Sequence, residues 1–144
     1  MKKLLKIVSL LVAFIFVFQM SFIENVNAQL IPVARDRDNG VNYLNTEKCA
    51  WFKDEYGNYR GLAIVRRMKE GESFYTESAF EFKRELGYSR SNSFADFRIP
   101  IVRFYDFNGN LKNSDVNENL PFEPAVYNSL ADSVLRALLK KASS

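Results

Sequence analysis

The sequence feature that most constrains the fold is a strand, turn and strand pattern over residues 49–67. Aromatic and β-branched residues dominate both arms, with Trp51 in the first and Ile64 in the second. The intervening residues 54–58 include Gly57, which suits the positive backbone angles of a tight turn. This pattern predicts a β-hairpin, and a hairpin needs further strands or a helix to bury its apolar face.

Residues 98–112 repeat the pattern, with a turn predicted at 106–110. Pro100 has no N–H to donate to a neighbouring strand, so we expect it at a sheet edge or beside a bulge. Gly61, inside the second arm of the first hairpin, predicts either a bulge or the close approach of another backbone.

The C-terminal residues 129–141 have the strongest helical pattern. Ser129 followed three residues later by Asp132 has the spacing of a capping box, and basic residues load the last turn. An apolar stripe runs along this segment: Leu130, Val134, Leu135, Leu138 and Leu139. The sequence therefore predicts an α+β fold, in which an antiparallel sheet of five or six strands carries this helix on one face. We expect Leu130, Val134 and Leu138 to be buried there.

Residues 74–86 fit two periodicities. Tyr75, Ala79, Phe82 and Leu86 recur at helical spacing, whereas the phenylalanines of this segment also alternate as in a strand. Several Glu, Lys and Arg residues favour a helix, so we predict helix here and leave strand as the alternative.

Residues 1–28 have the layout of a cleavable signal peptide. Three lysines precede an apolar run, and a polar stretch follows that ends at Ala28. The run holds about a dozen residues, fewer than the ~20 that span a bilayer. We predict cleavage after Ala28, a flexible lead-in over 29–39, a single domain over 40–144, and a secreted, periplasmic or cell-envelope location. An uncleaved N-terminal anchor is the alternative.

Loss of the signal peptide lowers the formal net charge from +3 to about +1. No basic run that is left is longer than the pair Arg66 and Arg67. Neither a nucleic-acid groove nor a polybasic membrane patch is indicated, and no membrane span is expected after cleavage.

The chain has no His and one Cys, which excludes metal sites built on imidazole or on paired thiols. Cys49 is predicted to be a buried, inert thiol, with an intermolecular disulfide as the alternative. Carboxylates such as Asp54, Glu55 and Asp106 are interpreted as turn residues rather than cation ligands. We expect no cofactor and no metal.

Aromatic residues are numerous: residues 29–144 keep nine Phe, seven Tyr and one Trp. Exposed Tyr beside Arg is typical of protein-binding surfaces. We predict such a surface at the first hairpin, formed by Tyr56, Tyr59, Arg60, Arg66 and Arg67. The alternative is that these residues only pack across strands, for example Tyr59 against Lys53 or Phe52.

Three short motifs resemble the small exported proteins of the surface-adhesin protein E family. They are residues 41–46 (VNYLNT), 105–109 (YDFNG) and 129–132 (SLAD), and the resemblance covers residues 40–141. It implies an antiparallel sheet with a terminal helix packed across it, and binding to host extracellular-matrix proteins. It also implies a cystine between sheet and helix, for which this chain has Phe97 and Leu139 and no second Cys.

We therefore predict an exported, non-enzymatic binding protein, adhesin-like, whose partner is a protein of the host extracellular matrix or the cell envelope. The oligomeric state is left open. The alternative is a small hydrolase or modulator that acts on envelope polysaccharide through carboxylates.

Overall fold

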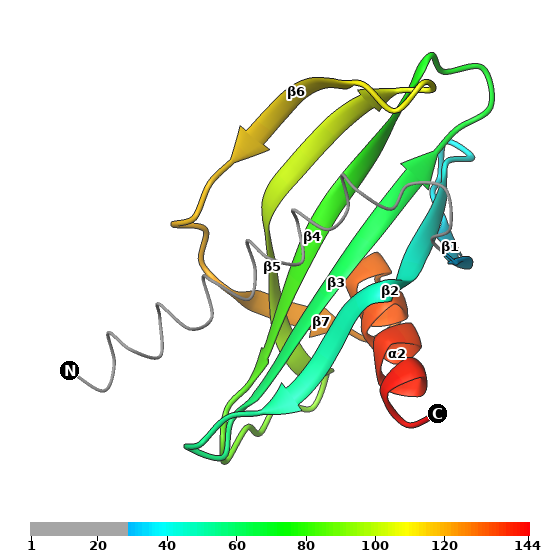
Figure 1. Cartoon of the computed structure of the whole chain (residues 1–144). Helices are drawn as coiled ribbons and strands as arrows, with labels where there is room; N and C mark the ends of the chain where they lie inside the picture. Colours follow the sequence, from blue (N-terminus) through cyan, green and yellow to red (C-terminus); the bar gives the residue numbers. More distant parts are fainter. Residues whose placement is uncertain (1–28) are drawn as a thin grey trace.

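The computed structural model describes residues 29–144, which form one antiparallel sheet and one helix (Figure 1). The predicted signal peptide, residues 1–28, lies outside the described residues. The strands are β1 (Leu30–Arg35), β2 (Val41–Lys53), β3 (Tyr59–Met68), β4 (Phe74–Arg84), β5 (Ser93–Asp106), β6 (Leu111–Val116) and β7 (Glu123–Val126), and the helix is α2 (Leu130–Ala142).

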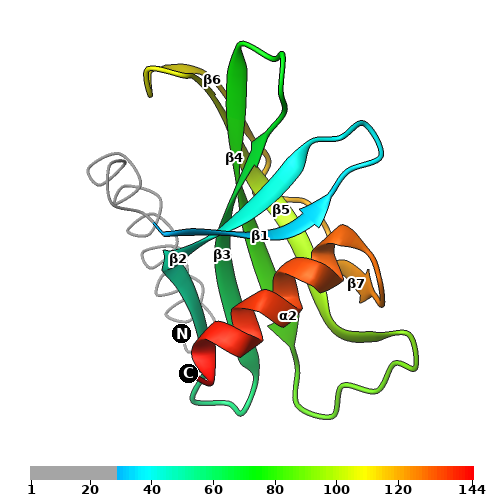
Figure 2. The same ribbon diagram turned by 90° about the vertical axis from the view of Figure 1, so that its right-hand side faces the viewer.

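The strands follow their chain order from β1 to β6, each antiparallel to the next. β6 pairs with residues 101–105 of β5, and β7 pairs with residues 93–97 of the same strand. Figure 2 shows α2 crossing one face of the sheet. The α+β prediction is confirmed, but the sheet has seven strands rather than five or six, because β1, β4 and β7 add to the predicted hairpins.

Strand β1 corrects the prediction of a flexible lead-in over residues 29–39. It pairs with residues 41–45 of β2, and Ile31 and Val33 pack against the core. The charged stretch after it is a turn, in which Asp36 N–H donates to Gly40 O at 2.7 Å. The alternating charges of residues 35–38 show no apolar period, so the sequence did not predict the short strand before them. That strand is stable only when it is paired.

Strand β4 corrects the prediction of a helix over residues 74–86. It lies in the middle of the sheet and pairs along most of its length with β3 and β5. The residues that favoured a helix include Glu77 and Glu81, which are buried and ion-paired to Arg66 and Arg98 of the adjacent strands. Pairing on both sides outweighs the local helical preference.

The two predicted hairpin turns are confirmed and share one geometry. Asp54 Oδ1 accepts hydrogen bonds from the N–H groups of Tyr56 and Asn58, at 2.9 and 3.0 Å. Asp106 Oδ1 does the same in the second turn, where Gly109 adopts a φ of 84°. These carboxylates organise turns, as predicted. Pro100 lies at a β-bulge of β5, also as predicted.

The core lies between the sheet and α2. Ser129 Oγ caps the helix by accepting from Asp132 N–H at 3.2 Å. Val134 and Leu138 are fully buried, as predicted, whereas Leu130 is 36% exposed and its predicted place in the interface is wrong. Leu130 is the first helical residue, and the buried positions of the helix begin at Ala131. The buried core contains Leu44, Ala63, Val65, Phe80, Phe82, Ala95, Ala125, Ala131, Val134, Leu135 and Leu138.

Gly61 is in regular register opposite Trp51, so the close approach there comes from side chains rather than from a bulge or backbone. A Cβ at Gly61 would lie 2.7 Å from Trp51 Cε3 and 3.0 Å from Leu138 Cδ2. We expect Gly61→Ala to lower the free energy of unfolding by about 1–3 kcal/mol, measured by urea unfolding with the single Trp as reporter. The same change in a Trp51→Leu background, followed by circular dichroism, should cost less, because the clashing ring is gone. Equal costs would contradict this packing.

Candidate functional site: a cleft at one end of the sheet

The tip of the first hairpin carries two of the predicted binding residues. Tyr56 is 39% exposed in the turn. Tyr59 stacks on Trp51 with 5.6 Å between ring centroids, and Lys53 Nζ lies 5.8 Å from the Tyr59 ring. Tyr59 therefore packs across the hairpin against Trp51 and Lys53. The contact with Lys53 is the one expected under the alternative, in which Tyr59 stabilises the hairpin.

The three predicted arginines do not form one group with the tyrosines of this tip. Arg60 follows Tyr59 in β3, so the two side chains leave opposite faces of the sheet, and Arg60 Nε lies 3.8 Å from Asp54 Oδ2. Arg66 and Arg67 lie near the far end of β3 and also leave opposite faces. The structure thus does not bring the five predicted residues into one surface.

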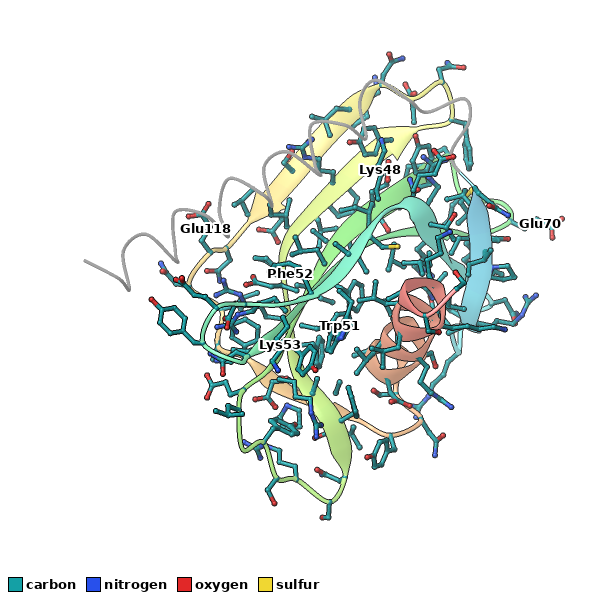
Figure 3. All side chains as sticks on the ribbon, turned by 60° about the horizontal axis from the view of Figure 1, so that its bottom comes forward. Lys48, Trp51, Phe52, Lys53, Glu70 and Glu118 are labelled. Carbon is teal, nitrogen blue, oxygen red and sulfur yellow. The ribbon has the colours of Figure 1, made fainter. Side chains whose placement is uncertain are left out.

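Arg66 belongs to a charged row on the face of the sheet away from α2. The register places it opposite Glu77, which is itself opposite Arg103. Arg66 Nη2 donates to Glu77 Oε1 at 3.4 Å. Burial raises the pKa of Glu77, an effect that Arg66, Lys48 and Arg103 oppose. Figure 3 shows Lys48 on this side of β2, whereas Trp51 lies between β2 and α2.

Aromatic side chains continue this face toward the end of the sheet. Tyr75 and Tyr105 are directly opposite in β4 and β5 and stack at 5.3 Å between ring centroids. The Arg66 guanidinium lies 4.4 Å from the centre of the Tyr75 ring. The Phe107 ring centroid lies 6.1 Å from that of Tyr75, and Phe107 is 56% exposed. The buried tyrosines thus support an exposed phenylalanine at the sheet end.

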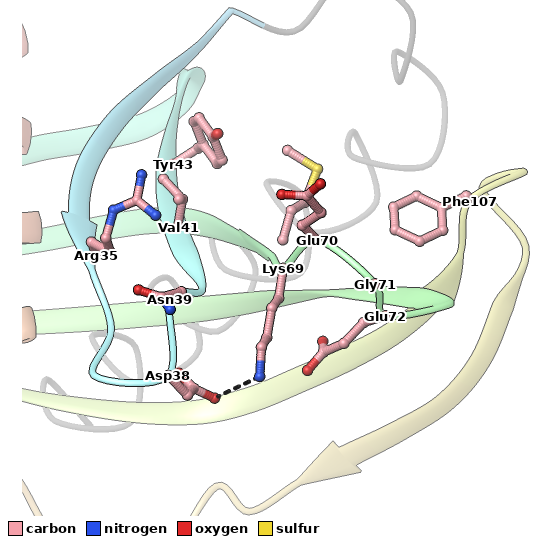
Figure 4. A pocket seen from close by; sticks show the side chains of 11 residues that line it. Arg35, Asp38, Asn39, Val41, Tyr43, Lys69, Glu70, Gly71, Glu72 and Phe107 are labelled. Carbon is pink, nitrogen blue, oxygen red and sulfur yellow. Dashed lines mark ion pairs between the residues drawn. The ribbon is translucent and has the colours of Figure 1, made fainter.

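A cleft of about 730 Å³ opens beside Phe107 (Figure 4). Its walls come from the β1–β2 hairpin and from the turn between β3 and β4, with Phe107 of the β5–β6 turn at one side. The lining residues are Arg35, Asp38, Asn39, Val41, Tyr43, Met68, Lys69, Glu70, Gly71, Glu72 and Phe107. Its volume is within the range of protein sites that hold small ligands or short peptide segments.

Ion pairs join the two turns that form the walls. Arg67 pairs with Asp36 and, at 2.9 Å, with Asp38 of the β1–β2 turn, and at 3.5 Å with Glu72 of the β3–β4 turn. Lys69 Nζ adds a second link to Asp38 at 3.8 Å, drawn in Figure 4. The hydrogen bond from Arg67 is the main reason that the pKa of Asp38 lies below its ordinary value. We call this set the Arg67 clamp. Because it spans both walls, it holds the cleft in one geometry.

Two exposed charges in the cleft lining take no part in the Arg67 clamp. Arg35 is the last residue of β1, and Glu70 lies in the turn after β3. In Figure 4 Arg35 lies on one side of Val41 and Tyr43, and Glu70 lies on their other side, toward Phe107. Each wall therefore carries one charge that the Arg67 clamp does not hold, and Val41 and Tyr43 supply an apolar floor.

Two side chains of a kind used in catalysis have shifted pKa values, Asp38 and Cys49. A general acid needs a raised pKa, whereas the pKa of Asp38 in the cleft is lowered. Within residues 29–144, no group of three or more His, Cys, Asp or Glu is placed to hold a metal. Cys49 is half-buried, its thiol donates to Thr46 O at 3.4 Å, and burial raises its pKa. This environment opposes formation of a thiolate.

Sequence reasoning missed this cleft because its lining comes from three separate turns and the strands beside them. One available signal was the alternation of Tyr75, Glu77, Ala79 and Glu81, which marks the strand whose Tyr75 lies against Phe107 beside the cleft. A second was the DxDNG sequence at 36–40, which resembles the Asp and Gly turns of both hairpins.

The chain matches no protein-family model, no curated protein and no solved structure in the three comparisons made. Within residues 29–144, no helix is long and apolar enough to cross a membrane.

Proposed function

We propose that the protein is a non-enzymatic, adhesin-like binding protein that is exported after cleavage following Ala28 and recognises a protein partner through the cleft. The observation that carries this proposal is the cleft itself: an accessible, clamped recess with the exposed Phe107 at its side. A preformed apolar recess with a polar rim is the usual form of a recognition site, and little ordering entropy is lost when it binds.

The resemblance to the surface-adhesin protein E family supports the class of partner, a protein of the host extracellular matrix or the cell envelope. Phe97 and Leu139, at the positions where that resemblance implies a cystine, both pack against the core.

The test is binding of the purified protein to a panel of immobilised extracellular-matrix and envelope proteins, followed by biolayer interferometry. We expect Phe107→Ala to weaken the binding at least about tenfold, because an exposed aromatic at a recess is a typical hot spot. The matched control is Tyr56→Ala, which removes an exposed aromatic from the equivalent Asp turn at the other end of the sheet.

Retained binding by Tyr56→Ala with lost binding by Phe107→Ala supports the cleft. Lost binding by Tyr56→Ala with retained binding by Phe107→Ala would instead place the binding site at the first hairpin. A combined Tyr56→Ala and Arg60→Ala variant would then lose binding fully. Absence of binding to every protein of the panel would contradict the proposed function.

A further inference from the structure

The two unclamped charges of the cleft point to a more specific ligand. Arg35 and Glu70 are exposed, carry opposite charges and come from different walls. The other charged side chains of the lining, Asp38, Lys69 and Glu72, are held by the Arg67 clamp. A ligand also meets the Asp38 carboxylate, which is 57% exposed, but Arg67 and Lys69 already pair with it. Arg35 and Glu70 are therefore the charges of the described lining that are left to pair with a ligand.

The surface between these charges is apolar. Val41 and Met68 are opposite each other in β2 and β3, and Tyr43 is two residues further along β2 on the same face. All three are half-buried, and Phe107 adds an exposed ring at the side. This floor offers contact to an apolar group, and Arg35 lies directly beside it as the register partner of Val41.

We propose that the cleft binds an extended peptide segment in which an acidic and a basic side chain flank an apolar residue. The acidic side chain meets Arg35, whose planar guanidinium suits a carboxylate, and the basic one meets Glu70. The apolar residue lies on the Val41, Tyr43 and Met68 floor. This inference rests on the proposed function and names the segment of the partner that the cleft recognises.

The location of the two charges on different walls also sets the direction of the bound segment. Its acidic side chain lies toward β1 and its basic one toward the turn after β3. A segment with two like charges makes one repulsive contact in the cleft. The cleft therefore binds a segment with one acidic and one basic side chain more tightly than a segment with two acidic or two basic ones.

The test uses three fluorescein-labelled, end-blocked peptides that differ at two positions. One carries Lys and Asp on either side of Leu, the second has Lys at both positions, and the third has Asp at both. Each is titrated against the wild type, Arg35→Glu and Glu70→Lys by fluorescence anisotropy. Because both residues are exposed and lie outside the Arg67 clamp, neither reversal removes an ion pair of the clamp.

We expect a switch of specificity. The wild type prefers the Lys and Asp peptide, Arg35→Glu prefers the two-Lys peptide, and Glu70→Lys prefers the two-Asp peptide. Each preference should be about tenfold at low salt and smaller at high salt, because the charges are exposed. Charge-matched controls at the other end of the sheet, Arg90→Glu and Glu123→Lys, should keep the wild-type preference.

Three outcomes separate this inference from the proposed function. If a matrix or envelope protein binds and Phe107→Ala abolishes that binding, but the three peptides bind equally to all variants, the cleft is a binding site and the charge assignment is overturned. A switch that the distant controls also produce overturns it too, because net charge alone then explains the result. If the peptide switch occurs while no protein of the panel binds, the ligand class holds and the proposed partner class fails.

Discussion

Replacing Val134 by Asp is expected to lower the free energy of unfolding by about 3–5 kcal/mol. Val134 has no exposed surface and lies in the buried cluster that joins α2 to the sheet. An Asp there puts a carboxylate among apolar side chains, so it either stays charged without a partner or takes up a proton. Urea unfolding followed by Trp51 fluorescence measures the loss.

The matched control for Val134→Asp is Lys140→Asp, which places the same carboxylate on an exposed position of the same helix. It should cost less than about 1 kcal/mol, mainly through the unfavourable charge near the helix C-terminus. If both variants unfold at the wild-type midpoint, α2 does not pack on the sheet through Val134.

Replacing Arg67 by Gln is expected to remove the Arg67 clamp, with a loss of about 1–3 kcal/mol in stability and a marked loss of cleft binding. Asp36, Asp38 and Glu72 then lose a shared cation, and the two wall turns are no longer linked through it. Hydrogen exchange over residues 36–40 and 69–73 should become faster than in the wild type.

Two further variants test the same clamp. Gly40→Ala does not change the Arg67 residue itself. The new Cβ at position 40 would lie 2.5 Å from Arg67 Nη2, so the guanidinium must move away. Its hydrogen-exchange pattern should resemble that of Arg67→Gln. Lys69→Gln removes only the 3.8 Å link to Asp38 and should change stability by less than about 1 kcal/mol. Unchanged exchange in both Arg67→Gln and Gly40→Ala would contradict the clamp.

The clamp also has a defined pH dependence. Because the pKa of Asp38 is lowered from 3.8 in the folded state, its ion pair stabilises the fold above that pH. The stabilisation is lost as the pH falls through the lowered pKa. The stability difference between the wild type and Arg67→Gln should therefore shrink in acid.

The features that the sequence predicted correctly depend on neighbours within a few residues. The two hairpin turns need an Asp that accepts from the next N–H groups and a Gly with positive φ, and both lie within five residues. The cap of α2 likewise needs only Ser129 and Asp132. Because these hydrogen bonds join near neighbours, the residue types and their spacing are enough to predict the two turns and the helix cap.

Tertiary structure decided what the local pattern left ambiguous. Residues 74–84 satisfied both a helical and a strand periodicity, and pairing with β3 and β5 selected the strand. Strand β1 follows the same principle, since its few apolar residues gain stability only against β2 and the core.

The cleft also combines features that the sequence predicts with features that only the tertiary structure decides. Arginines and aromatic residues were visible in the sequence, and they suggested a binding surface in general terms. Alternation along β3 sent Arg66 and Arg67 to opposite faces, and the clamp joined Arg67 to Asp36, 31 positions earlier in the chain. Sequence alone thus determined the turns, the helix and the class of surface chemistry, because these follow from residue type and short spacing. Only the sheet register decided which charges and rings meet at one site, because it brings together segments that are distant along the chain.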